Sequence, residues 1–149
     1  MLLLLVRTSR YHCRMADRVT PERRSFIMSK VGQKNTAPEM ALRRALHARG
    51  FRYRLHRRDL PGAPDLVFPS RQKVVFVHGC FWHGHDCRWG RAPKSRGEYW
   101  LPKIEANRVR DNLALTKLSD MGWQTFVVWQ CELRDPEAAI QRVVAFLND

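Results

Sequence analysis

The spacing of apolar residues changes several times along the chain, and each change predicts a new element. Helical spacing predicts helices over residues 20–31 and 36–50. Thr20-Pro21-Glu22 supplies an N-cap, a proline and an acid at the start of the first helix. Thr36 and Glu39 have the form of a capping box at the start of the second. The first third of the chain is therefore expected to be helical.

Shorter apolar runs follow and predict strands. Residues 51–55 alternate between apolar and polar, whereas residues 65–68 and 73–78 are continuous apolar runs typical of covered strands. A long loop is expected over residues 79–98. It is followed by a helix over 101–118, a strand over 125–129 and a helix over 135–147. Asp135 is expected to cap the last helix. The order ααβββαβα, without internal repeats, predicts an α/β sandwich around a mixed sheet.

Charge narrows the class of partner. The 149 residues suit one domain, and 27 basic minus 14 acidic residues give a net charge of +13 spread along the chain. A polyanion, above all nucleic acid, is the expected partner, although ribosomal, histone-like and membrane-surface proteins share this charge. The apolar residues 1–6 are too few to span a bilayer, which needs about 20. Residues 1–14 are interpreted as a disordered or mis-annotated extension, and residues 15–149 as one domain.

Three cysteines and a histidine form a candidate metal site. Cys80, His85 and Cys87 lie in one loop, and Cys131 follows the last predicted strand. These four residues could complete a tetrahedral zinc shell if that strand lies beside the strand ending at His78. Buried free cysteines are an equal alternative. Apart from Cys13 in the expected extension, the chain has three cysteines, which do not suit a disulfide framework, so a reducing cytoplasm is expected.

Asp65 is the candidate for a second kind of metal site. A carboxylate at a strand edge, beside backbone carbonyls, can hold Mg²⁺ against a phosphodiester, although an aspartate after a proline more often stabilises a turn. The predicted hairpin returns at residues 76–78 and places a second set of groups beside Asp65, as in the proline-aspartate nuclease motif. The glutamate and lysine of that motif are missing here. His78 and a main-chain carbonyl would have to replace them.

The loop between these two sites carries further candidates. A neutral imidazole at His83 could accept a proton from water near neutral pH, or His83 could be a surface histidine or one that supports the zinc ligands. Phe81, Trp82 and Trp100 could belong to the core. Because Phe81 and Trp82 are adjacent in a loop rich in Gly and His, at least one of the two is expected at the surface, where it could stack on bases.

On these residues the chain resembles the very-short-patch-repair (Vsr) mismatch endonucleases. The resemblance runs from about Met15 to Cys131 and is carried by four blocks: Pro61-Gly62-Ala63-Pro64-Asp65, His78-Gly79-Cys80-Phe81-Trp82-His83 with His85 and Cys87, Trp100-Leu101-Pro102-Lys103-Ile104, and Val128-Trp129-Gln130-Cys131. It implies a restriction-endonuclease-like fold, a three-layer sandwich with a mixed central sheet and a structural zinc site.

The resemblance also implies roles for individual residues. Asp65 and the main-chain carbonyl of Val77 would bind Mg²⁺, Glu39 and His78 would act through its waters, and His83 would be the base or position the water. Cys80, His85, Cys87 and Cys131 would hold zinc. The residues implied in DNA binding are the wedges Phe81, Trp82 and Trp100, the T:G readers Lys103 and Asn107, and Met28, which would press in from the minor groove. Whether Glu39 serves the metal or its helix stays open.

The function that the resemblance implies is Mg²⁺-dependent nicking of duplex DNA on the 5′ side of the thymine in a T:G mismatch. Its partners would be mismatched duplex DNA and, in repair, a MutL-type protein and a DNA polymerase, and the enzyme would be a monomer in the bacterial cytoplasm, at the nucleoid when bound to DNA. Two alternatives stay open. One is a zinc-stabilised DNA-binding protein without cleavage, and the other is a nuclease of the same fold with another substrate preference.

Overall fold

A computed structural model describes residues 20–30, 34–92, 94 and 96–149 of the chain. The expected extension, residues 1–14, lies outside these residues. The elements follow in the expected order, with two short 3₁₀ helices added: α1 (Pro21–Lys30), α2 (Ala37–Ala48), β1 (Arg54–Leu55), β2 (Leu66–Phe68), η1 (Pro69–Arg71), β3 (Lys73–His78), α3 (Gly97–Asp120), β4 (Gln124–Trp129), η2 (Glu132–Arg134) and α4 (Pro136–Asn148). None of the described helices is long and apolar enough to cross a membrane.

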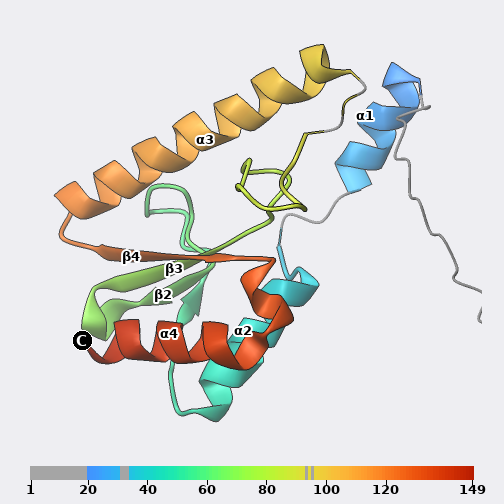
Figure 1. The fold of residues 1–149 in the computed structure, drawn as a ribbon. Coiled ribbons are helices and arrows are strands. Elements are labelled where there is room, and N and C mark those ends of the chain that lie inside the picture. The colour runs from blue at the N-terminus through green and yellow to red at the C-terminus, as the bar shows by residue number, and fades with distance from the viewer. Residues whose placement is uncertain (1–19, 31–33, 93, 95) are drawn as a thin grey trace, which may run out of the picture.

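The four strands form one mixed sheet in the order β1-β2-β3-β4. β1, β2 and β3 pair antiparallel, while β3 and β4 pair parallel, with His78 opposite Trp129. Parallel neighbours need a crossover connection, and α3 supplies it along one face of the sheet (Figure 1). The mixed sheet was correctly predicted, and the strands that end at His78 and Trp129 are neighbours, which is the condition that the four-ligand metal site required.

Helices cover both faces of this sheet, so the fold has three layers (Figure 1). On one face, α2 and α4 pack through Leu42, Leu46, Ile140, Val143 and Leu147 against Leu66, Phe68, Val75 and Val128. On the other face, Leu118 of α3 packs with Leu60, Val67, Val74 and Phe76. Consecutive residues of β2 and β3 thus face opposite layers, because side chains alternate across a strand. Burial on both faces explains their continuous apolar sequence.

Two element boundaries differ from the expectation. The strand expected over residues 51–55 is paired only at Arg54 and Leu55. The alternation before them arises from packing, since the rings of Phe51 and Tyr53 lie 6.4 and 5.8 Å from that of Phe68, centroid to centroid. α3 begins at Gly97, four residues before the expected start at Leu101, and its first turn carries the buried Trp100.

One of the three expected helix caps is confirmed, because Oγ1 of Thr20 accepts the backbone N–H of Arg23 at 3.3 Å, and the other two were wrong in detail. Thr36 and Asp135 occupy the N-cap positions of α2 and α4, but neither side chain makes a capping hydrogen bond. The carboxylate of Glu39 instead accepts the backbone N–H of Asn35 at 2.7 Å, one residue before the position that a capping box uses. Glu39 therefore satisfies a donor at the helix start with Oε2, while Oε1 faces Arg43 and His56.

We predict that Leu118→Ala lowers the free energy of unfolding by about 2–5 kcal/mol, because truncating a fully buried leucine leaves a cavity. Leu113→Ala is the matched control on the same helix. Leu113 is 56% exposed, so its truncation should cost about 0.5 kcal/mol or less. Urea unfolding measures both variants. The slope of the free energy of unfolding against urea concentration should stay unchanged. Equal losses would show that α3 does not pack on the sheet through Leu118.

Candidate active site and cysteine–histidine cluster

Asp65 stands immediately before β2, at the end of the turn Pro61–Pro64. Gly62 makes this turn possible: it has a φ of +74°, and a Cβ there would lie 2.9 Å from the Cβ of Ala114 on α3. The Asp65 side chain is 18% exposed, and its Oδ2 accepts the backbone N–H of Val77 at 2.7 Å. The expected meeting of Asp65 with the end of the next strand is confirmed. The contact shown goes through the N–H of Val77, and the role of its carbonyl stays a prediction.

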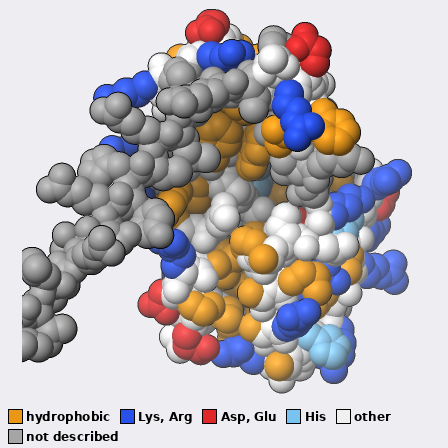
Figure 2. Space-filling model, turned by 90° about the vertical axis from the view of Figure 1, so that its right-hand side faces the viewer, with side chains coloured by type: hydrophobic (Ala, Val, Ile, Leu, Met, Phe, Trp, Pro, Cys, Tyr) orange, Lys and Arg blue, Asp and Glu red, His pale blue; other side chains and the backbone are white. Residues whose placement is uncertain are grey.

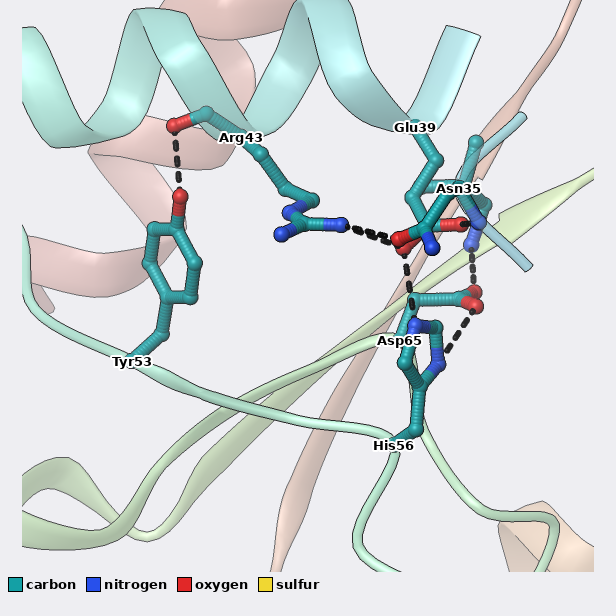
Figure 3. Close-up of polar contacts among 7 residues, drawn as sticks. Asn35, Glu39, Arg43, Tyr53, His56 and Asp65 are labelled. Atoms are coloured by element: carbon teal, nitrogen blue, oxygen red, sulfur yellow. Dashed lines mark hydrogen bonds and ion pairs between the residues drawn. The ribbon is translucent and has the colours of Figure 1, made fainter. Parts of the chain in front are cut away.

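Glu39 and His56 complete a cluster around Asp65 (Figure 3). Glu39 comes from α2, and its side chain is only 2% exposed. His56 follows β1, and its two ring nitrogens face the two carboxylates: Nε2 lies 3.1 Å from Oε1 of Glu39, and Nδ1 lies 3.7 Å from Oδ1 of Asp65. Arg43 also approaches Oε1 of Glu39, at 3.4 Å. Three elements distant in sequence therefore bring two carboxylates and an imidazole together.

The pKa of Asp65 is raised to about 6, mainly by desolvation. The negative charge of Glu39 raises this pKa further, while the N–H of Val77 and the neighbouring His83 lower it. A buried carboxylate beside a second one is poorly stabilised when ionised, and a bound cation would reverse this penalty. The electrostatics of the cluster therefore fit a divalent cation, which prefers such oxygen ligands.

A second cluster lies next to it and consists of His78, His83 and Asp111. The rings of His78 and His83 are stacked, with centroids 3.9 Å apart and planes 6° from parallel. Nδ1 of His83 contacts Oδ2 of Asp111. An imidazole that donates Nδ1–H to a carboxylate keeps its lone pair on Nε2, so His83 is held in the form that accepts a proton there. Burial and, to a smaller extent, the neighbouring His83 lower the pKa of His78 to about 4.

α3 holds this second cluster in place. Besides its contact with Gly62, the helix touches the following loop at Gly84, where a Cβ would lie 2.7 Å from Cγ2 of Ile104. Gly84 has a φ of +59°, which a side chain rarely allows. Asp111 lies between these two contacts in the helix. The close approach of α3 to both loops therefore sets Asp111 beside His83.

Cys80, His85, Cys87 and Cys131 form a third cluster, as expected, with ligand atoms all within 4.8 Å of one another. Sγ of Cys131 lies 3.4 Å from Nδ1 of His85, and Sγ of Cys80 accepts the N–H of Cys131 at 3.3 Å. Ligands around tetrahedral zinc lie about 3.8 Å apart, given a Zn–S distance of about 2.3 Å. The spacing and the three-sulfur, one-nitrogen donor set fit a structural metal.

The chemistry of the thiols agrees with this interpretation. Desolvation raises the pKa of Cys87, but hydrogen bonds with His85 and with the N–H groups of Trp89 and Gly90 outweigh it and leave this pKa at about 7. Burial raises the pKa of Cys80 to about 12. Cys87 is therefore ready to bind a cation as a thiolate near neutral pH, whereas Cys80 would lose its proton only to the metal.

The three expected wedge residues form one aromatic cluster. Phe81 lies 5.1 Å from both Trp82 and Trp100, centroid to centroid, in edge-on geometry. Trp100 is buried and only 6% exposed, while Phe81 and Trp82 are half-buried. The amide of Asn107 donates to the carbonyl of Trp82 at 2.7 Å. The structure thus groups these residues at one place but shows none of them fully displayed.

The remaining expected DNA contacts lie on two helices. Lys103 is exposed on α3, with Nζ 5.7 Å from the centroid of the Tyr99 ring. Met28 belongs to α1, but its side chain lies outside the described part of the structure. Figure 2 shows a face hollowed near its centre, with hydrophobic side chains along the hollow and Lys and Arg side chains near its rim. Such a face can offer apolar contacts inside a cationic border.

Two residues of these clusters, His56 and Asp111, were not predicted from the sequence. Asp111 directly follows Arg110 in a helix, where an acid usually balances surface charge. Only the packing of α3 brings it to His83. His56 lies one residue beyond the Arg54–Leu55 pairing, and the register that sets it opposite Asp65 is not visible in the sequence. One signal for His56 was available in the sequence. This histidine follows the alternating segment 51–55 and precedes the candidate carboxylate Asp65 on the same hairpin.

The sequence of this chain is similar to the sequences of known DNA endonucleases. The family model of the DNA mismatch endonuclease Vsr matches residues 16–89, which include Glu39, His56 and Asp65. The type II nicking enzyme V.XorIIP of Xanthomonas oryzae pv. oryzae is 62% identical over 134 residues, covering 90% of this chain and 98% of the relative. The type II nicking enzyme V.NmeAIP of Neisseria meningitidis is 43% identical over 129 residues, covering 87% and 92%.

The DNA mismatch endonuclease Vsr of Escherichia coli K12 is 39% identical over 123 residues, covering 83% of this chain and 79% of the relative. These similarities define a DNA endonuclease, a class whose divalent-metal chemistry the carboxylate cluster fits. Within that class, the chain belongs to the DNA mismatch endonuclease Vsr family. The resemblance found in the four sequence blocks is confirmed.

We predict that Cys131→Ser loses the metal of the cysteine–histidine cluster, because a hydroxyl is a poor fourth ligand. Elemental analysis should find about one zinc per wild-type chain and far less in the variant. A site filled at about 1,000 times its dissociation constant contributes about 4 kcal/mol, so unfolding should occur at lower urea. Asp86→Ser, at an exposed position in the same loop, should keep its zinc. A well-folded wild type without zinc would refute the site.

Proposed function

We propose that this protein nicks duplex DNA at T:G mismatches, on the 5′ side of the mismatched thymine, by Mg²⁺-dependent hydrolysis of a phosphodiester. The observation that carries this proposal is the buried Asp65 beside the main chain of Val77, with the His83–Asp111 pair close enough to affect its pKa. The printed names of the relatives, a DNA mismatch endonuclease and nicking enzymes, support the same activity.

Asp65 and the carbonyl of Val77 would hold the Mg²⁺, with Glu39 and His78 contacting its waters. The donor set fits a hard cation, since carboxylate and carbonyl oxygens are its preferred ligands. Mg²⁺ would neutralise charge on the phosphate and polarise it for attack. The carboxylate of Glu39 is shared, because Oε2 binds the N–H of Asn35 and Oε1 faces His56. Glu39 thus serves its helix start and the site together.

His83 would take a proton from the attacking water at Nε2, because Asp111 occupies Nδ1. Asp111 would also stabilise the imidazolium that results. His78, stacked on His83, has a pKa of about 4 and stays neutral near neutral pH, so it does not add charge against this imidazolium. His83 and Asp111 therefore combine a base with the group that orients it.

Mismatch choice would come from the aromatic cluster Phe81, Trp82 and Trp100. A T:G step is more weakly stacked and paired than a normal step, so wedging side chains into it costs less. Asn107 now holds the carbonyl of Trp82, and it would have to release this bond to read the T:G pair with Lys103. Met28 would approach from the minor groove. The net charge of +13 would supply affinity for phosphates without sequence choice.

The proposal also covers the fold, the structural metal, the location and the partners of the protein. The three-layer architecture around a mixed sheet suits a restriction-endonuclease-like fold, and the cysteine–histidine cluster suits structural zinc. The protein would act as a monomer in the bacterial cytoplasm, at the nucleoid when bound to DNA. A MutL-type protein and a DNA polymerase would act with it in repair.

We predict that Asp65→Asn reduces nicking of a labelled T:G duplex in Mg²⁺ by more than about 100-fold, since the metal loses its only direct carboxylate ligand. Asp59→Asn is the matched control, because Asp59 is 58% exposed and pairs with Arg57 in the preceding loop. It should nick like wild type. If wild type and Asp65→Asn bind the duplex and neither cuts it, the protein binds DNA without cleaving it. Equal nicking of paired DNA would indicate another substrate preference.

We predict that His83→Ala slows nicking about 10²–10⁴-fold, the usual contribution of a general base, while its affinity for the T:G duplex stays near that of wild type. Asp111→Asn should slow turnover in the same direction because the imidazole loses its orienting carboxylate. Single-turnover nicking and fluorescence anisotropy measure the two quantities. His47→Ala, at an exposed position of α2, is the control. Near-normal turnover of His83→Ala would remove His83 from the mechanism.

A further inference from the structure

We propose that His56 is a nitrogen ligand of the divalent cation at Asp65, so that the site is a mixed nitrogen–oxygen site. This inference rests on the proposed metal-dependent function. Its first support is the strand register. Arg54 pairs with Val67 and Leu55 with Leu66, so His56 follows the last pair and lies opposite Asp65. The backbone N–H of His56 indeed reaches the carbonyl of Asp65, at 3.4 Å. Directly opposite residues of a ladder present their side chains on the same face.

The distance between His56 and Asp65 suits shared coordination better than hydrogen bonding. Nδ1 of His56 lies 3.7 Å from Oδ1 of Asp65, beyond the 2.7–3.2 Å that is usual for a hydrogen bond. Two ligands that share one cation at about 2.1 Å lie between about 3 Å apart when adjacent and about 4.2 Å when opposite. The observed separation falls within that interval. Figure 3 shows the ring of His56 between Glu39 and Asp65.

The lone pairs point to the same conclusion. Among the described residues, the buried Nε2 of His56 has no hydrogen-bond partner, although Oε1 of Glu39 is only 3.1 Å away. A neutral imidazole has one N–H and one lone pair, so it can donate to at most one of two carboxylates. Its other nitrogen must then face an oxygen lone pair. A cation placed among these atoms converts this repulsion into coordination.

The backbone at His56 also indicates a residue held for its side chain. His56 has a φ of +46°, in the left-handed region that non-glycine residues seldom adopt. Such conformations cost free energy and persist where the surrounding structure fixes them, often at functional sites. At His56 this conformation ends β1 while the side chain, 13% exposed, stays against Glu39 and Asp65.

A nitrogen ligand changes which metals the site prefers. Mg²⁺ and Mn²⁺ both favour oxygen ligands, but Mn²⁺, as a transition-metal ion, accepts an imidazole nitrogen more readily than Mg²⁺ does. His56→Asn keeps a polar neutral group but replaces the nitrogen ligand by an amide oxygen. We expect this variant to weaken Mn²⁺ binding about 10–100-fold and Mg²⁺ binding clearly less. A residue that merely positions the carboxylates would weaken both metals by the same factor.

The test titrates Mn²⁺ and Mg²⁺ into the full chain by calorimetry and records the pulsed electron paramagnetic resonance of bound Mn²⁺. A directly coordinated imidazole gives nitrogen-14 modulation of the spin echo. This modulation should be present in wild type, absent in His56→Asn and retained in the control His47→Asn. Circular dichroism should show that all three proteins are folded. The zinc content should be equal as well, so that the cysteine–histidine cluster does not contribute.

The outcomes separate this inference from the proposed function. Wild-type protein that nicks DNA and binds Mn²⁺ without nitrogen modulation would overturn the role of His56 alone. Modulation that survives in His56→Asn, or equal weakening of both metals, would overturn it too. Wild-type protein that binds neither metal and does not nick would overturn the metal-dependent function together with this inference.

Discussion

The arrangement of the site depends on one constraint: the carboxylate of Asp65 is largely buried and must still be able to ionise. The backbone N–H groups of Val77 and of Asp65 itself lower the pKa of this carboxylate, but burial outweighs them and leaves the pKa of Asp65 at about 6. The position of Asp65 follows from the β2–β3 hairpin, whose apolar residues are covered on both faces. The packing that stabilises the sheet therefore also creates the electrostatic demand for a cation.

Much of this arrangement could be predicted from the sequence because it follows from local pattern. Continuous apolar runs identified β2 and β3 as covered strands, and the hairpin between them brought Asp65 to Val77. The parallel neighbourhood of β3 and β4 then brought Cys131 to Cys80. In both cases the residues that carry chemistry sit at strand ends, so the order of the strands was sufficient to bring them together.

What could not be predicted depends on long-range packing or on backbone geometry. Asp111 reaches His83 only because α3 touches two glycines in different loops. The start of α3 at Gly97 depends on the burial of Trp100, which the loop-like composition of this segment did not indicate. The Thr36 cap failed for a related reason, since Glu39 accepts the N–H of Asn35 while its second oxygen faces His56. Tertiary contacts override local preference at these points.

The cysteine–histidine cluster has a consequence for the order in which the site assembles. Cys80 and Cys131 are 51 positions apart, and the segment between them contains α3, β4, Trp100 and Asp111. A metal bound early would close this segment into a ring and remove much of its freedom in the unfolded chain, as a cross-link does. His83 and Asp111 would then search for each other within a tethered loop. The structural metal would act on catalysis through folding entropy, without approaching the reacting phosphate.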